Sequence, residues 1–177
     1  ANVTKNTNTT CTVTNTMPYG TITVTKTVIN DDGGLLTIGS FTIRIDGAVV
    51  GSGVAKNVSV GTHTVSEDGI FGYLATFSGD CDASGNVIVG AGGNKSCTIT
   101  NNDIRPSITL VKNVVGGSAA PDDFDVSIDG AVKTSGSSNP VTANTAHVID
   151  EEVMGPGYSF TSITGAAFLG VPCPAAP

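Results

Sequence analysis

The chain has 177 residues, a formal net charge of −7 and only 13% charged residues. A chain of this length suits one or two small domains, and its negative charge argues against a nucleic-acid partner, because phosphates require a basic face. No signal peptide and no membrane-spanning run is present, so we expect no membrane insertion of this segment and either a mature product or a piece of a longer chain.

Short runs that alternate β-branched and polar residues predict an all-β fold. Tryptophan is absent, 23 glycines mark frequent turns, and no window has the periodicity of an amphipathic helix. In chain order, residues 1–19 predict a loop and a terminal strand around residues 11–15. This strand has no partner within its own segment.

Residues 20–105 contain the signals of a complete β-sandwich. About seven short strands separated by turn residues are typical of this architecture. The expected strands cover residues 21–29, 41–45, 54–60, 63–67, 72–77, 86–90 and 96–102.

Residues 106–177 start the same pattern again and stop before its last strand. Cys11 and Cys97 are 86 positions apart, and the same separation relates the pairs that follow: Asn15 and Asn101, Lys26 and Lys112. Such a constant offset is the signature of a repeat. The sequence therefore predicts tandem immunoglobulin-like or prealbumin-like β-sandwich repeats, with residues 106–177 as an incomplete unit.

Three motifs of the complete unit resemble a known family. Lys26 lies near the end of the first strand, Glu67 lies in TVSEDG (residues 64–69) followed by Gly72-Tyr73, and Asn101 ends TITN. These motifs resemble the Cna-B (prealbumin-like) domains of bacterial surface adhesins and pilin shafts. The resemblance implies an isopeptide bond between Lys26 and Asn101, with Glu67 as proton shuttle.

The chain departs from the family pattern at three places. His63 replaces the usual aromatic residue before the glutamate strand, and a cysteine pair is added. The proline that usually follows the glutamate is missing at residues 70–71, although Pro156 supplies one in the second unit.

Strand periodicity supports the same three residues independently of the family. Residues two apart share a face of a strand, so Lys26, Glu67 and Asn101 should all point to the apolar side. Burial favours a neutral amine and a protonated acid, from which the lysine can attack the asparagine amide and release ammonia. The alternative is a buried Lys–Glu ion pair with the asparagine hydrogen-bonded beside it. Lys112 and Glu151 repeat two members of the set.

The four cysteines do not have metal-ligand spacing, and a surface protein favours disulfides. Cys81 and Cys97 belong to one unit, so we expect them to be bonded. Cys11 and Cys173 have no partner within a complete unit, which leaves free thiols or a bond between units.

Other sites have weaker signals. Asp31, Asp32, Asp80 and Asp82 suggest calcium, but they lack a calcium-loop spacing and the first two form a turn; we predict no metal and no cofactor. His63 and His147 occupy equivalent positions, which favours packing. Four asparagines match the glycosylation sequon: Asn2, Asn8, Asn57 and Asn94.

These patterns predict a structural subunit or repeat segment of an extracellular filament, pilus or stalk on the cell surface, and no enzyme beyond single-turnover bond formation. The alternative is an adhesin module that binds a glycan or a protein. The expected partners are copies of the chain itself, in a head-to-tail homopolymer.

The two ends suggest how copies join. If Ala1 followed Pro177, Cys173 and Cys11 would be 15 positions apart, against 16 for Cys81 and Cys97. We therefore expect residues 1–19 to complete a neighbouring unit, by strand donation or by chain continuity. Cys11 would then bond to Cys173, and Asn15 would meet Lys112 and Glu151.

Overall fold

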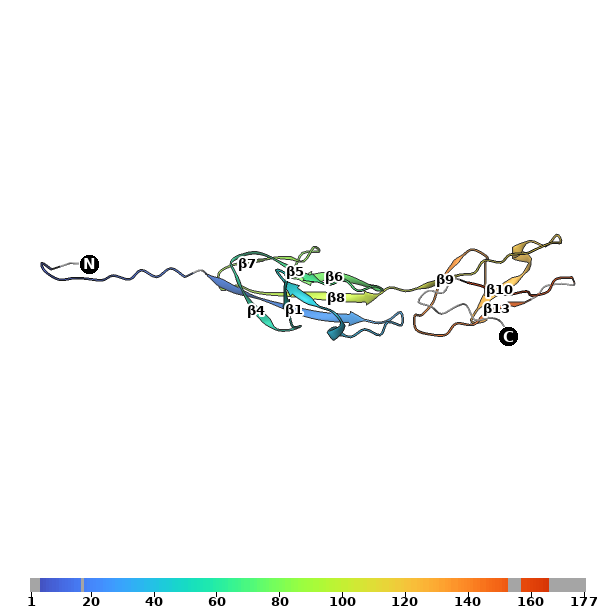
Figure 1. Cartoon of the computed structure of the whole chain (residues 1–177), viewed down its shortest axis with the longest axis horizontal. Helices are drawn as coiled ribbons and strands as arrows, with labels where there is room; N and C mark the ends of the chain where they lie inside the picture. Colours follow the sequence, from blue (N-terminus) through green and yellow to red (C-terminus); the bar gives the residue numbers. More distant parts are fainter. Residues whose placement is uncertain (1–3, 17, 153–156, 166–177) are drawn as a thin grey trace. The chain divides into compact units, whose positions relative to one another are not determined.

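The computed structural model describes residues 4–16, 18–152 and 157–165 (Figure 1). Strands predominate, and helix in these ranges is limited to two three-residue 3-10 turns. No helix in the described part of the chain is long and apolar enough to cross a membrane. The chain forms two compact units: Ala1–Ile29 with Leu36–Asn102, and Asn30–Leu35 with Asp103–Pro177.

The first unit is built from two four-stranded sheets, with the orders β4-β1-β8-β6 and β3-β2-β5-β7. Its strands are β1 (Tyr19–Ile29), β2 (Ile43–Ile45), β3 (Ala48–Val50), β4 (Ala55–Ser59), β5 (Gly61–Glu67), β6 (Tyr73–Gly79), β7 (Asn86–Val89) and β8 (Asn94–Asp103). The 3-10 turn η1 (Ile38–Ser40) precedes β2.

One core joins the two sheets. Buried residues of β1 and β8, such as Val24 and Ile99, cluster with buried residues of β2, β5 and β7, such as Ile45, Val65 and Val87. The alternation of threonine with apolar residues along β1 produces this arrangement, since every second side chain points inward. The first unit is therefore sandwich-like, with its two sheets face to face.

The first and last strands of this unit lie side by side in the same direction (Figure 1). In the parallel register of β1 and β8, Val24 lies opposite Cys97 and Lys26 lies opposite Ile99. The chain thus enters the unit at one end and leaves it at the other.

A two-residue turn joins β2 to β3. Asp46 and Gly47 have φ angles of 49° and 78°, and an Asp-Gly pair favours the hairpin turns that need positive φ at both positions. The second unit repeats this turn at Asp129 and Gly130, with φ angles of 52° and 76°.

The second unit has fewer paired strands in its described part. β10 (Asp125–Ile128) lies between β11 (Ala131–Lys133) and β13 (Ile149–Glu152), and β9 (Ser107–Thr109) pairs with β12 (Ser138–Pro140). The 3-10 turn η2 (Pro121–Asp123) precedes β10. The buried hydrophobic residues described in this unit are Phe124, Val126 and Ile128.

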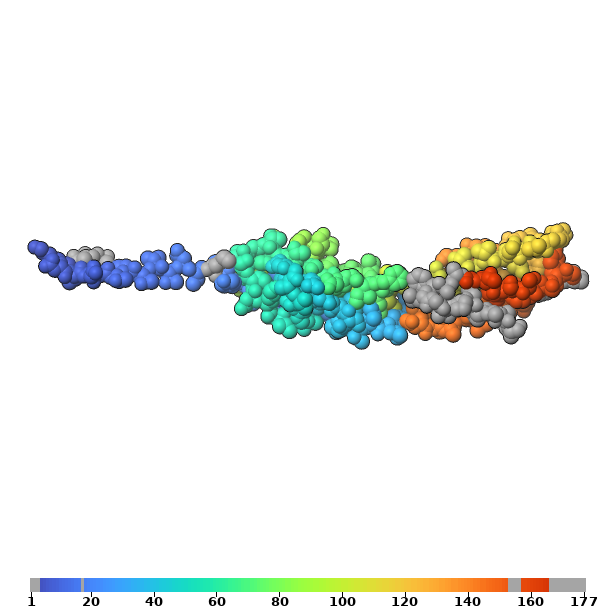
Figure 2. Space-filling view, in the orientation of Figure 1, coloured from blue at the N-terminus to red at the C-terminus, as the bar shows by residue number. Residues whose placement is uncertain are grey.

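Two expected strands differ from the observed ones. The strand expected at residues 41–45 begins at Ile43, because η1 turns the chain just before it. Residues 4–16 include no strand, and every one of them is exposed (blue in Figure 2). The repeated segment at residues 11–15 has no partner strand here, so its β-propensity alone does not produce a strand.

Candidate functional site

Three polar residues meet in the apolar core of the first unit. β1 carries Lys26 on the same face as Ile22 and Val24, and β8 carries Asn101 on the same face as Ile99. Glu67 is the last residue of β5, which belongs to the other sheet. The three residues therefore connect the first strand, the last strand and both sheets.

Their side chains form a closed set of contacts. Lys26 Nζ donates to Asn101 Oδ1 at 2.5 Å, and Asn101 Nδ2 donates to Glu67 Oε1 at 2.5 Å. Lys26 Nζ also lies 3.0 Å from Glu67 Oε2, and the two side chains are 0% and 2% exposed. The expectation that these residues share the apolar face agrees with this burial.

The electrostatics of the set are dominated by burial. Burial lowers the pKa of Lys26, while the nearby Glu67 carboxylate raises it in part. Glu67 Oε2 accepts no hydrogen bond from the residues that the structure describes. Its 3.0 Å contact with Lys26 Nζ is thus an ion-pair contact outside hydrogen-bond geometry.

Two aromatic rings close the site. Lys26 Nζ lies 4.4 Å from the centroid of the Phe41 ring, and Tyr73 packs edge-on against Phe41 at 5.5 Å. The ring face attracts the ammonium form and also keeps water away from the amine. Phe41 was not predicted from the sequence as part of the site, although its place before a strand, repeated at Phe124, was a usable signal.

This geometry allows amide formation between lysine and asparagine. A carbonyl bond is about 1.23 Å long, so the Cγ of Asn101 lies within about 3.7 Å of the amine, close to the separation of a near-attack arrangement. Rotating the Asn101 amide by half a turn would place its oxygen against Glu67, where a protonated carboxyl could polarise it. Without that rotation, the same side chains form the ion pair that is the alternative interpretation.

The second unit repeats most of this site. Lys112 Nζ donates to Glu151 Oε1 and lies 4.4 Å from the Phe124 ring centroid, and Tyr158 packs edge-on against Phe124 at 5.3 Å. The Lys112 and Glu151 side chains are 14% and 9% exposed. Asn15, the expected third member, is exposed in the N-terminal segment of the first unit.

A disulfide is attached to the strand that carries Asn101, since Cys97 lies four positions before it in β8. Cys81 and Cys97 are at bonding distance, with an S–S separation of 2.00 Å, and both are buried in the core of the first unit. Cys11 is a free, exposed thiol. Cys173, its expected partner, lies outside the described residues.

The acidic residues expected as weak calcium candidates do not form one group. Asp80 pairs with Lys95, and Asp82 caps its own turn through the Ser84 and Asn86 amides. Asp31 and Asp32 instead lie near Asp103, whose carboxylate accepts from the Asp32 and Gly34 amides. Asp103 therefore holds the turn at residues 30–35, a role that sequence reasoning missed.

The two histidines are held by aspartates. His63 Nδ1 lies 2.7 Å from Asp46 Oδ2 and His63 Nε2 lies 2.8 Å from the Ser59 carbonyl oxygen. In the second unit, His147 makes the same pair of contacts with Asp129 and the Thr142 carbonyl. These contacts fix the hairpin turns, in line with a packing role.

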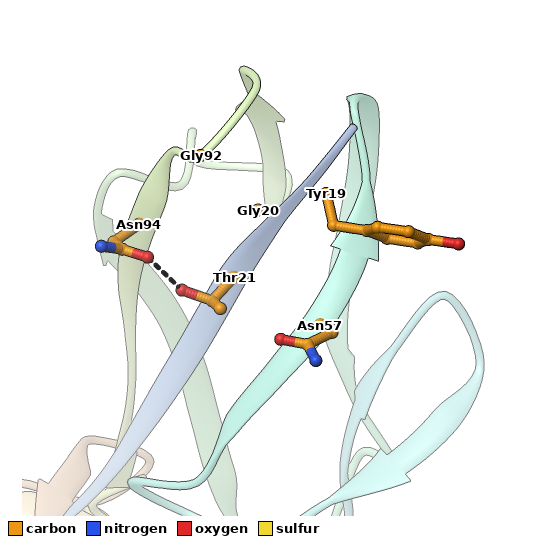
Figure 3. A pocket seen from close by; sticks show the side chains of 6 residues that line it. All are labelled: Tyr19, Gly20, Thr21, Asn57, Gly92 and Asn94. Atoms are coloured by element: carbon orange, nitrogen blue, oxygen red, sulfur yellow. Dashed lines mark hydrogen bonds between the residues drawn. The ribbon is translucent and has the colours of Figure 1, made fainter. Parts of the chain in front are cut away.

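A shallow pocket lies at the start of β1 (Figure 3). Two sequon residues, Asn57 and Asn94, line it with Tyr19, and Thr21 donates to Asn94 Oδ1 at 2.7 Å. The Tyr19 ring is turned away from Asn94. Asn8, a third sequon residue, is exposed, and Asn2 lies outside the described residues.

Comparison with known proteins found no matching family model, no matching curated protein and no matching solved structure. The resemblance to Cna-B domains therefore depends on the quoted motifs alone.

Proposed function

We propose that this chain is a structural segment of an extracellular filament, pilus or stalk, made of tandem Cna-B-like (prealbumin-like) β-sandwich units. Each complete unit is stapled by a disulfide and by a Lys–Asn isopeptide bond. The units are joined end to end by strand complementation or by chain continuity. The observation that carries this proposal is the buried contact of Lys26 with Asn101 and Glu67.

The proposed bond forms in one turnover. The neutral Lys26 amine attacks Asn101 Cγ, the bond from Cγ to the amide nitrogen breaks, and ammonia leaves. Protonated Glu67 gives its proton to the departing nitrogen and takes one from Lys26 Nζ, so it ends in the form in which it began. No oxidant or cofactor is needed, and a secondary amide replaces a primary amide and an amine.

The position of the bond suits a load-bearing role. β1 and β8 are parallel neighbours, so tension applied to the two ends of the unit shears this strand pair. An amide between Lys26 and Asn101 would carry the load directly from the first strand to the last. The chain between them, including both sheets, would then be shielded from the force.

Matched contacts in the two units support a tandem arrangement. The lysine over a phenylalanine ring, the edge-on tyrosine and the Asp–His turn all occur in both units. The Lys26 and Lys112 backbone amides each donate to a serine hydroxyl, Ser52 and Ser135. The disulfide suits an oxidising, extracellular compartment.

Intact mass tests the bond. If the Lys26–Asn101 bond forms, the wild-type chain should weigh one ammonia less than its sequence mass. Glu67→Ala should remain folded and show its full sequence mass. Peptide mapping should then find residues 26 and 101 in one branched fragment. A wild-type chain that has its full sequence mass, with no ammonia lost from residues 26 and 101, would reject the isopeptide bond and leave the buried ion pair as the interpretation.

The pocket at the start of β1 favours a second candidate function, an adhesin module that binds a glycan. Tyr19 is 60% exposed, and the amides of Asn57 and Asn94 line the same pocket, so an aromatic side chain and polar donors and acceptors of the kind that bind sugars occur in one surface region. Screening the chain against immobilised glycans tests this candidate, with Tyr19→Ala as the control.

A further inference from the structure

The second unit has an open strand edge in its described part. In the first unit, β1 has β4 on one side and β8 on the other. In the second unit, β9 pairs antiparallel with β12, as β1 does with β4, and no described strand takes the place of β8. An unpaired edge of this kind is a template for another strand.

The inner face beside this edge is only partly covered. Ile22 and Val24 of β1 are 0% exposed. Their counterparts Ile108 and Leu110 alternate in the same way with exposed neighbours, but they are half-buried. Among the described residues, no strand gives the apolar face of residues 107–114 the layer that β8 supplies in the first unit.

Residues 8–16 match the missing strand. They carry the CTVTN sequence that β8 carries as CTITN, and Val13 is 85% exposed. Transferring the β1–β8 register by the 86-residue offset places Cys11 opposite Leu110 and Val13 opposite Lys112. Cys11, Val13 and Asn15 would then face the core.

The described residues beside the edge also lack a counterpart of Asn101. Lys112 and Glu151 are already paired beside Phe124, whereas Lys26 in the first unit has Asn101 as an additional partner. A strand seated in this register would bring Asn15 to the position that Asn101 occupies. The site would then contain an amine, a carboxyl and a side-chain amide.

Connectivity favours a second copy as the source of this strand. Residues 17 and 18 are all that separate the segment from β1, and the three chain steps from residue 16 to residue 19 span at most about 11 Å. The segment thus stays near the entry of its own first unit. The parallel β1–β8 pair places the exit toward β9 at the other end of that unit.

We propose that the edge of residues 107–114 accepts residues 8–16 of a second copy as a parallel strand, and that Lys112 then forms an amide with the Asn15 side chain of that copy. The Lys112 nitrogen bonds to Asn15 Cγ, the amide C–N bond breaks, and Glu151 carries one proton from the Lys112 nitrogen to the departing amide nitrogen, which leaves as ammonia. This inference depends on the proposed function for its bond chemistry, and it names the partner.

Two variants of the full chain test the link. Asn15→Ala keeps the edge with Lys112 and lacks the side-chain amide of residue 15. Lys112→Ala keeps the strand with Asn15 and lacks the amine. In reducing, denaturing electrophoresis, wild type should form a ladder and each variant alone should remain monomeric. A mixture of the two should yield a dimer and nothing larger, with residues 15 and 112 in one branched peptide.

A second pair of variants tests the register. Val13→Glu places a charge in the core-facing position and should abolish the ladder. Thr12→Glu places the same charge on the outward face and should retain it. Both residues are exposed in the free segment, so neither change should unfold the chain.

Several outcomes would overturn the proposal. These are a mixture that gives no dimer, a cross-link confined to monomers, assembly that dissociates fully in denaturant, or equal effects of Val13→Glu and Thr12→Glu. None of the four variants changes Lys26, Glu67 or Asn101, so the Lys26–Asn101 bond is read from the same peptide map. Its presence without a dimer rejects only the link between copies, and a dimer without it rejects only the bond within the unit.

Discussion

Lys26 and Asn101 are 75 residues apart in the sequence, yet Lys26 Nζ lies 2.5 Å from Asn101 Oδ1 in a buried site. The contact joins the strand that opens the first unit to the strand that closes it. Because Glu67 reaches the same point from the facing sheet, one small site couples three elements. Changes at this site should therefore affect the whole unit.

Replacing Lys26 by Met should strongly destabilise the first unit. The change removes the proposed Lys26–Asn101 amide and leaves Glu67 buried without its partner, and stranding one member of a buried pair costs about 3–5 kcal/mol. Adding Glu67→Leu should recover the part of the loss that comes from the stranded carboxyl, while the cross-link stays absent. Denaturant unfolding measures both effects.

The Arg44–Asp68 pair provides the control. Its side chains are 33% and 56% exposed, so Arg44→Met should leave the stability almost unchanged, because solvent screens an exposed pair. A Lys26→Met variant as stable as Arg44→Met would show that the buried contacts contribute little.

Opening the Cys81–Cys97 disulfide should lower the free energy of unfolding by about 3 kcal/mol, which is the contribution that loop-closure entropy makes for a loop of this length. Thermal unfolding of Cys81→Ala/Cys97→Ala measures the loss. Cys11→Ala is the matched control, since Cys11 is exposed and free and its removal should leave the melting temperature unchanged. Equal melting temperatures for all three proteins would contradict the expectation.

Gly20→Ala should destabilise the start of β1. A Cβ at Gly20 would meet the Val89 side chain and, at 2.5 Å, the Gly93 carbonyl oxygen. Overpacking of this kind costs about 1–3 kcal/mol, and the loss should appear as earlier unfolding. Gly90→Ala has nothing within 4 Å and should be tolerated. A larger loss of stability for Gly90→Ala than for Gly20→Ala would show that the close approach at Gly20 does not determine the stability of this region.

Stability should fall as the pH rises above neutrality. Both nitrogens of His63 face groups that can only accept, so the ring is held as imidazolium; the hydrogen bond to Asp46, followed by that to the Ser59 carbonyl, raises its pKa. The stability from this group is fully present below its usual pKa of about 6.5 and is lost as the pH rises through the raised value. The pKa of His147 is raised in the same way by Asp129.

Unfolding measured from mildly acidic to mildly alkaline pH checks this expectation. Asp46→Asn combined with Asp129→Asn should flatten the profile, because the amides keep their size and still accept from Thr64 and Val148. If the free energy of unfolding of the wild type rises with pH through this range, the expected contribution of the histidine contacts is contradicted.

Much of the candidate site was predictable from local pattern. The period of two along β1 places Lys26 with Ile22 and Val24, and the structure buries all three. The Asp46-Gly47 turn was equally readable, because the pair favours positive φ at both positions. By contrast, Phe41 and Asp103 were missed, since their roles come from packing against residues that are distant in sequence.

The sequence by itself determined which residues face inward and that their pattern recurs, because side-chain alternation and a constant offset are properties of the chain alone. Tertiary structure decided which of the repeated segments become strands. Residues 94–103 form β8 because β1 offers them a partner, while the matching residues 11–15 have none among the described residues and form no strand. Strand formation requires hydrogen bonds to a second strand, and no local propensity supplies them.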